Sequence, residues 1–187
     1  MTAITGLFDG RSWRGWSIAM WAGGALLLAL PAIAMQFTSE VNWDAADFIA
    51  MGAIIFTACA ACELAARASS NGAYRLGAIS AVAAAFMTIW ANLAVGMIGS
   101  EDNPYNLLFG GVLALALTGG IAVRFKASKL ALVMLAAAIV HAVVAAIGYS
   151  SDPRGGTFSL FFTLPWLLSA ALFWSAAPQE GQARSIS

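Results

Sequence analysis

The segment that decides the fold runs from Leu130 to Ser151 and reads LALVMLAAAIVHAVVAAIGYSS, without one charged side chain. A helix that crosses the hydrocarbon core of a bilayer, about 30 Å thick, needs roughly 20 such residues. The segment is continuously apolar, whereas a strand of a membrane barrel alternates between apolar and polar residues. We therefore expect a transmembrane helix here, at about residues 129–149.

The same pattern recurs along the chain, which is 61% hydrophobic and only 10% charged, whereas soluble domains are about 25% charged. Further uncharged stretches cover 15–39, 76–100, 104–123 and 155–179, and 48–66 is interrupted only by Glu63. The sequence therefore predicts an all-α integral membrane protein, a single transmembrane domain over residues 1–187. We expect a six-helix bundle, whose other helices lie at about 16–37, 46–67, 76–99, 105–123 and 157–176.

Charges at the predicted helix ends give an orientation. Every basic residue except Arg154 lies on one side, namely Arg11, Arg14, Arg67, Arg75, Arg124, Lys126, Lys129 and Arg184. Most acidic residues lie on the other side: Glu40, Asp44, Asp47, Glu101, Asp102 and Asp152. Because basic loops stay inside, we expect both termini in the cytoplasm. With a net charge of zero and such short loops, no surface for nucleic acid is expected.

The first segment has a second interpretation. Arg11 and Arg14 precede an apolar run over 16–30, and Ala32-Ile33-Ala34 follows, which resembles a signal peptide with a small-residue cleavage site. The uncharged run over 15–39 is longer than such a peptide needs, so a membrane span is favoured. The orientation of the other five spans is the same under either interpretation.

A parallel repeat of the second and third helices in the fourth and fifth is a further hypothesis. A shift of 49 residues, on the order of one helix pair, places Arg75 on Arg124, Asn92 on His141 and Pro104 on Pro153. Alanine-rich helices match one another easily, so an accidental match is the alternative.

Among the few polar side chains inside predicted spans, Glu63, His141 and Asn92 are the functional candidates. Glu63 has Arg67 four residues on, so a boundary ion pair is its plainest role. His141 is the only histidine, and one histidine cannot complete a multi-histidine metal site. It is a proton acceptor or gate, or a neutral ring bonded to a neighbouring helix. For Asn92 the plainest role is interhelical hydrogen bonding.

Cys59 and Cys62 form a C-x-x-C pair on one helix face. Two thiolates could bind Cu(I), together with His141 or a methionine, but buried reduced cysteines that fill space explain the pair as well. We expect reduced cysteines, no metal and no cofactor. Because no nucleophile–base arrangement can be assembled, enzymatic activity is not expected.

Acidic residues gather in two loops on the poorly basic side. Asp47 opens one predicted helix, and Glu101 and Asp102 precede another. If these loops adjoin, their oxygen atoms could attract a hard cation. Helix capping is the competing explanation, because acidic residues and amides stabilise helix N-termini.

Two loop segments carry a resemblance. MQFTSEVNW, residues 35–43, and VGMIGSEDNP, residues 95–104, resemble signatures of a group of uncharacterised bacterial multi-pass membrane proteins. The resemblance covers roughly residues 20–150 and implies a bacterial inner membrane. It implies no activity and no functional residues.

Two functions from different classes follow. The first is a small permease or channel-like protein, with an acidic vestibule at the extracytoplasmic side formed by Asp47, Glu101 and Asp102. The second is a non-catalytic accessory or structural subunit of a larger membrane complex, to which the alanine-rich helices would pack closely. Apart from the lipid bilayer, the expected partners are therefore further copies of the chain or other membrane subunits.

Overall fold

The structure, a computed structural model, describes residues 10–185, with side chains placed for residues 15–178. Within these residues it is all-helical, and six helices are long and apolar enough to cross a membrane. The predicted all-α fold with six candidate spans is thereby confirmed. Asp9 lies outside the described residues, and so do the side chains of Arg11, Arg14, Glu180 and Arg184. The chain divides into two compact units, residues 1–72 and 73–187.

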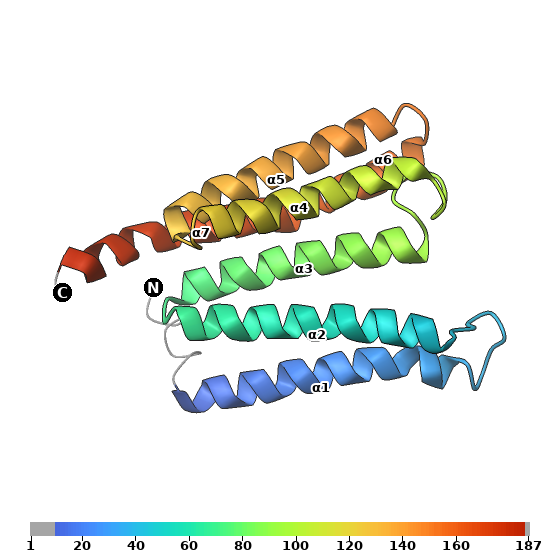
Figure 1. The fold of residues 1–187 in the computed structure, drawn as a ribbon, viewed down its shortest axis with the longest axis horizontal. Helices are drawn as coiled ribbons and strands as arrows, with labels where there is room; N and C mark the ends of the chain where they lie inside the picture. Colours follow the sequence, from blue (N-terminus) through green and yellow to red (C-terminus); the bar gives the residue numbers. More distant parts are fainter. Residues whose placement is uncertain (1–9, 186–187) are drawn as a thin grey trace. The chain divides into compact units, whose positions relative to one another are not determined.

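Unit 1 is a pair of antiparallel helices, α1 (Gly10–Ala34) and α2 (Ala45–Ala68) (Figure 1). A glycine allows their close approach, because a Cβ atom added to Gly24 would lie 2.8 Å from the side chain of Ile55. The rings of Trp21 and Phe56 pack nearby, with centroids 5.4 Å apart. Pro31 lies inside α1, which continues to Ala34.

The start of α2 comes directly after the first loop signature, residues 35–43. Asp44 is the N-cap, and its Oδ1 accepts hydrogen bonds from the N–H groups of Ala46 (2.7 Å) and Asp47 (3.0 Å). In return, the carboxylate of Asp47 accepts from the N–H of Asp44 at 2.9 Å, which completes a capping box. The rings of Trp43 and Phe48 meet edge to face at 5.3 Å across this cap. The capping box, together with the contact between Trp43 and Phe48, therefore fixes where α2 begins.

Unit 2 is built around α5 (Ala127–Gly148), against which three other helices pack. Buried alanines on α5, among them Ala131, Ala137, Ala138 and Ala145, permit this close packing. The other elements are α3 (Gly72–Ala94), η2 (Pro104–Asn106), α4 (Leu107–Ala122), α6 (Pro153–Phe161) and α7 (Thr163–Ser185) (Figure 1).

Hydroxyl groups join α3 to α7. Ser80 donates to the carbonyl oxygen of Pro165 at 2.7 Å, and Ser169 donates to that of Gly77 at 2.8 Å. An edge-to-face contact between Tyr74 and Phe173, at 5.1 Å, lies alongside. Each hydroxyl thus forms a direct hydrogen bond to the backbone of the neighbouring helix.

Two helices end differently from the sequence prediction. The third was expected to reach about residue 99, but α3 ends at Ala94, and the chain turns at Gly96 and Gly99 with φ of 73° and 72°. The sixth was expected to be one helix over 157–176, but it is broken at Phe162 into α6 and α7. Pro165 explains the break, because proline has no N–H for the carbonyl four residues earlier and its ring clashes there.

The duplication of the second and third helices remains a prediction. The two loop ends that it pairs are alike, since Asn103-Pro104 and Asp152-Pro153 are each an N-cap followed by proline at the first helical position. However, the boundary between the two units falls between α2 and α3, inside the first supposed repeat.

Close packing at Gly156 gives a first prediction. A Cβ atom there would lie 2.6 Å from the Cα of Tyr149, so Gly156→Ala must displace backbone. We expect a loss of about 1–3 kcal/mol in unfolding free energy, measured as a lower melting temperature in mild detergent.

Gly111→Ala is the matched control, because no atom lies within 4 Å of a Cβ atom at that position of α4. Alanine favours the helix by about 0.5–1 kcal/mol there, so the control should be neutral or stabilising. Equal melting temperatures for Gly156→Ala and Gly111→Ala would contradict the packing of α6 against Tyr149.

Candidate functional site

The loop between α3 and η2, residues 95–103, is folded into unit 2. Met97 and Ile98 are 0% and 1% exposed. They belong to one hydrophobic cluster with Ala91, Val144 and two aromatic side chains, Phe109 and Phe162. A loop with buried residues must satisfy its own backbone polar groups, because water does not reach them.

Two asparagines satisfy much of this backbone. Asn106 Oδ1 accepts from the N–H groups of Met97 (3.2 Å) and Ile98 (2.9 Å), and its Nδ2 donates to the carbonyl oxygen of Ser100 (2.8 Å). Asn103 Nδ2 donates to the carbonyl oxygen of Ile98 at 3.0 Å. Asn103 also caps η2, accepting from the N–H of Tyr105 at 3.0 Å. Asn103, inside the second loop signature, and Asn106, two residues after it, therefore hold this loop in place.

Asp152 ties the same loop to α6. One carboxylate oxygen accepts from the N–H of Gly99 at 2.8 Å, and the other accepts from those of Arg154 (3.1 Å) and Gly155 (3.0 Å). These backbone hydrogen bonds, those from Gly155 and Gly99 foremost, hold the pKa of Asp152 below its ordinary value. Ser159 adds a bond, donating to the carbonyl oxygen of Met97 at 3.0 Å. The loop thus depends on a carboxylate and a hydroxyl far from it in sequence.

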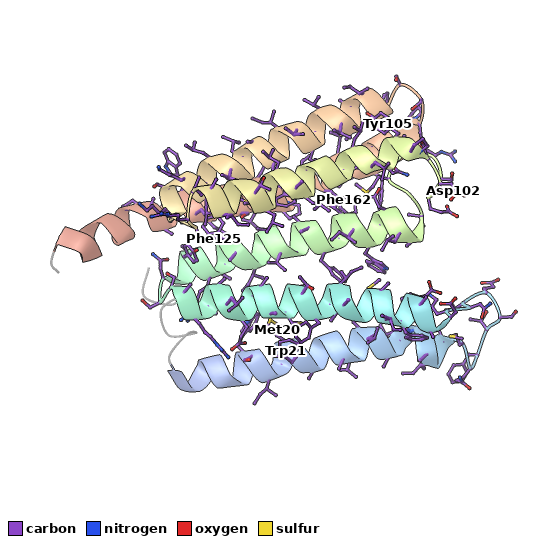
Figure 2. The ribbon with its side chains drawn as sticks, viewed as in Figure 1. Met20, Trp21, Asp102, Tyr105, Phe125 and Phe162 are labelled. Atoms are coloured by element: carbon purple, nitrogen blue, oxygen red, sulfur yellow. The ribbon has the colours of Figure 1, made fainter. Side chains whose placement is uncertain are left out.

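The acidic residues predicted as a vestibule lie in an exposed turn and in a helix cap. Glu101 and Asp102 lie exposed at the turn of this loop, and Figure 2 shows Asp102 at the edge of the ribbon. Asp47 belongs to the capping box of unit 1. Among the described residues, no group of three or more His, Cys, Asp or Glu side chains could hold a metal ion. Capping thus accounts for Asp47, and a cation site at Glu101 and Asp102 remains a prediction.

His141 lies inside unit 2 and is 0% exposed. Its ring stands 5.0 Å from that of Phe109, and it stacks on Phe162 at 6.4 Å with 4° between the planes. The backbone of Ser159 is the polar group that approaches the ring, and within the described chain neither ring nitrogen makes a hydrogen bond of ordinary length and angle. The expected hydrogen bond to a neighbouring helix therefore stays a prediction, with the backbone of Ser159 on α6 as its candidate partner.

Two further buried polar atoms of unit 2 have no partner among the described residues. Asn92 was expected to bond between helices, but its Nδ2 donates to the carbonyl oxygen of Thr88 on its own helix at 2.8 Å, and its Oδ1 is unpartnered. Trp166 on α7 is 1% exposed, and its Nε1 is likewise unpartnered. Buried polar atoms are normally hydrogen-bonded, so Asn92, Trp166 and His141 are the candidate functional residues of unit 2.

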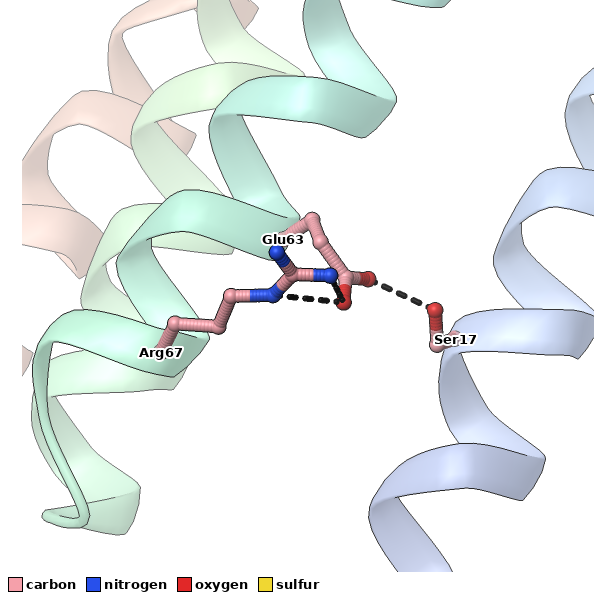
Figure 3. A network of polar contacts seen from close by, with 3 residues as sticks. All are labelled: Ser17, Glu63 and Arg67. Carbon is pink, nitrogen blue, oxygen red and sulfur yellow. Dashed lines mark hydrogen bonds and ion pairs between the residues drawn. The ribbon is translucent and has the colours of Figure 1, made fainter.

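Glu63 joins the two helices of unit 1 (Figure 3). One carboxylate oxygen pairs with Arg67 at 3.0 Å, and the other accepts from the hydroxyl of Ser17 on α1 at 2.6 Å. The side chain of Arg67 is 70% exposed and that of Glu63 only 12%. The ion pair predicted from the spacing of the two residues is thus formed, and its partner on α1 could not be read from that spacing.

Cys59 and Cys62 are free and buried. The only close polar neighbour found for the Cys59 thiol among the described residues is the carbonyl oxygen of Met20, at 3.9 Å. Both cysteines pack as small apolar side chains would.

The residues that hold the loop were not among the predicted site residues. Asp152-Pro153 carries a sequence signal, an N-cap residue followed by proline. Asn106 stands at the start of the helix predicted over 105–123, a position that indicates a helix cap and not bonds to the preceding loop. Ser159 carries no signal, because its bond to the carbonyl of Met97 links residues far apart in sequence.

In comparisons with known proteins, the chain matches no family model, no curated protein and no solved structure. The resemblance to bacterial multi-pass proteins therefore remains a prediction from the two loop signatures.

The lowered pKa of Asp152 gives a second prediction. Its contribution to stability is fully present above the pKa of an unfolded aspartate, about 3.9, and is lost as the pH falls through the lowered folded value. Asp152→Asn should therefore have a lower melting temperature than wild type at neutral pH. The asparagine amide either turns its own N–H group toward the N–H of Gly99 or accepts that hydrogen bond with an uncharged oxygen. The difference in melting temperature should narrow below about pH 4.

Asp102→Asn is the control, since the Asp102 side chain is exposed and makes no hydrogen bond with the described residues. It should melt like wild type at every pH. A deficit in Asp152→Asn that does not change with pH would show that shape, and not charge, holds the loop.

Proposed function

We propose that this chain is a small multi-pass permease or channel-like protein whose solute meets the buried polar side chains of unit 2. The observation that carries the proposal is His141, a fully buried ring whose one polar neighbour found among the described residues is the backbone of Ser159, and whose nitrogens make no hydrogen bond of ordinary length and angle there. Polar side chains inside a membrane protein are unfavourable unless they are paired or serve a solute pathway. An apolar residue would fill the space between Phe109 and Phe162 at lower cost in free energy.

Asn92 and Trp166 support the proposal from two other helices of the same unit. They add an unpartnered acceptor on α3 and an unpartnered donor on α7. The acidic loops contribute less, because Asp47 serves as a helix cap. We therefore centre the proposed function on the interior of unit 2 and not on an acidic vestibule.

The proposed setting is a bacterial inner membrane, with the basic helix ends and both termini in the cytoplasm. Single cysteines placed in a background without Cys59 and Cys62 test this orientation. Residues introduced at exposed Ser39 and Ser151 should react with a membrane-impermeant maleimide in intact cells, whereas those at Ser70 and Lys126 should react only after lysis. Labelling of Ser70 in intact cells would overturn the orientation.

Proteoliposomes test the function itself. We expect wild-type protein to accelerate the flux of at least one small solute in a panel of urea, glycerol, Na⁺, K⁺ and H⁺ over protein-free vesicles. His141→Leu should reduce that flux, and Gly111→Ala, at a position with open space on α4, should not. No flux for any member of the panel would contradict a permease.

The second candidate, an accessory subunit, is favoured by the open face of α4. Gly110 and Gly111 have no neighbouring atoms where a Cβ would stand, and Leu107 and Leu117 are exposed. Small residues of this kind allow another helix to approach closely. A larger co-purifying membrane partner, together with the absence of flux, would favour this role over transport.

A further inference from the structure

We infer that the turn between α4 and α5 binds the headgroup of an anionic phospholipid. The turn covers residues 123–126 and joins two helices that are each long and apolar enough to cross a membrane, Pro104–Ala122 and Ala127–Gly148. Such a site requires the membrane setting but no transport of a solute, so it goes beyond the proposed function. It is also independent of the direction of insertion, because headgroups lie at both faces of a bilayer.

Three basic side chains gather at this turn. Arg124 and Lys126 belong to it, and Lys129 lies in the first turn of α5. All three are exposed, and within the described chain none of them takes part in an ion pair. Like charges so close in sequence repel one another, and an anion bound beside them would relieve that repulsion.

Acidic side chains lie far from these charges. Those placed in unit 2 are Glu101, Asp102 and Asp152, in the loops at the other end of α5, and Figure 2 shows Phe125 and Asp102 at opposite ends of the unit. A helix of 22 residues is about 33 Å long, several times the Debye length of about 8 Å at physiological ionic strength. These carboxylates therefore do not neutralise the turn. The side chain of Glu180, the remaining acidic residue of unit 2, lies outside those described.

Exposed apolar side chains accompany the basic ones. Phe125, inside the turn, is 53% exposed, and Ile121, at the end of α4, is 56% exposed. Leu132, near the start of α5, is 58% exposed. A water-soluble anion would gain nothing from these side chains, whereas a phospholipid offers acyl chains to them and a phosphate to the basic groups. The combination therefore fits a lipid better than a free anion.

The backbone of the turn adopts a costly conformation. Arg124 and Phe125 have φ of 54° and 53°, in the left-handed region that favours glycine. The turn is a Schellman motif, in which the N–H of Phe125 donates to the carbonyl oxygen of Gly120 at 3.0 Å and that of Arg124 to Ile121 at 2.9 Å. The Tyr74 hydroxyl donates to the carbonyl oxygen of Phe125 at 3.0 Å. Glycine usually stands where Arg124 does, and a lipid phosphate on the guanidinium would offset the unfavourable backbone of arginine.

Thermal melting in an uncharged detergent tests for the lipid. We expect dioleoyl phosphatidylglycerol to raise the melting temperature saturably. Dioleoyl phosphatidylcholine, which has the same acyl chains but no net charge, should raise it less, and sodium phosphate at matched ionic strength should not reproduce the increase. Equal effects of the two lipids would overturn the inference. An equal effect of phosphate alone would overturn it in favour of a site for a soluble anion.

Single neutralisations locate the site. Arg124→Gln, Lys126→Gln and Lys129→Gln should each weaken the apparent affinity for phosphatidylglycerol about fivefold, the effect of one basic residue near an anionic surface. Arg154→Gln is the matched control, because Arg154 is exposed and basic but lies at the start of α6, beyond the other end of α5. It should bind the lipid like wild type. Equal losses in all four variants would show attraction to overall charge and overturn the site.

Arg124→Gly separates lipid binding from the stability of the turn. Without lipid, glycine should leave the melting temperature unchanged or raise it, because it adopts a φ of this kind without strain. With phosphatidylglycerol, the increase in melting temperature should be smaller than for wild type, and an equal increase would overturn the inference. If a glutamine variant does not fold, the glycine variant and the comparison of the two lipids on wild type decide.

Discussion

The backbone of residues 95–103 must find its hydrogen-bond partners inside the protein, and the packing of unit 2 follows from how it does so. Asn106 bonds the N–H groups of Met97 and Ile98, and Asp152 bonds that of Gly99. With those groups satisfied, the two apolar side chains can enter the core against Phe109 and Phe162. Without them, burial of the loop would leave several unpaired backbone groups, each costing about 1–3 kcal/mol.

The same requirement accounts for the break in the last candidate span. Pro165 removes one helix hydrogen bond, and hydroxyl groups supply bonds around the break: Ser80 donates to the carbonyl of Pro165, and Thr163 donates to that of Leu160. In an apolar chain, an irregular segment persists where neighbouring side chains satisfy the backbone. Both irregular segments of unit 2, the loop and the break, are therefore fixed by serine, threonine, asparagine or aspartate.

Hydropathy predicted the helices, because twenty or so consecutive apolar residues have few alternatives to a helix in a membrane. It could not predict that Val95–Gly99 leaves the helix, since Met97 and Ile98 are as apolar as their neighbours and only the glycines mark the turn. The ion pair of Glu63 and Arg67 was predictable because both residues lie on one helix. The positions of the Asn92 and His141 side chains were not predictable, because contacts between helices depend on rotation about the helix axes, which a uniformly apolar sequence scarcely specifies. Asn92 bonds within its own helix, and His141 lies against Phe109 and Phe162.

The start of α2 and the loop at Met97 differ in how early in synthesis they can form. The capping box and the Trp43–Phe48 contact join residues at most five apart, so this start is complete as soon as the first turn of α2 has been synthesised. The loop at Met97 requires Asp152 and Ser159, which are separated from their partners by 53 and 62 residues. During synthesis, the loop can therefore reach its final arrangement only after Asp152 and Ser159 have been made.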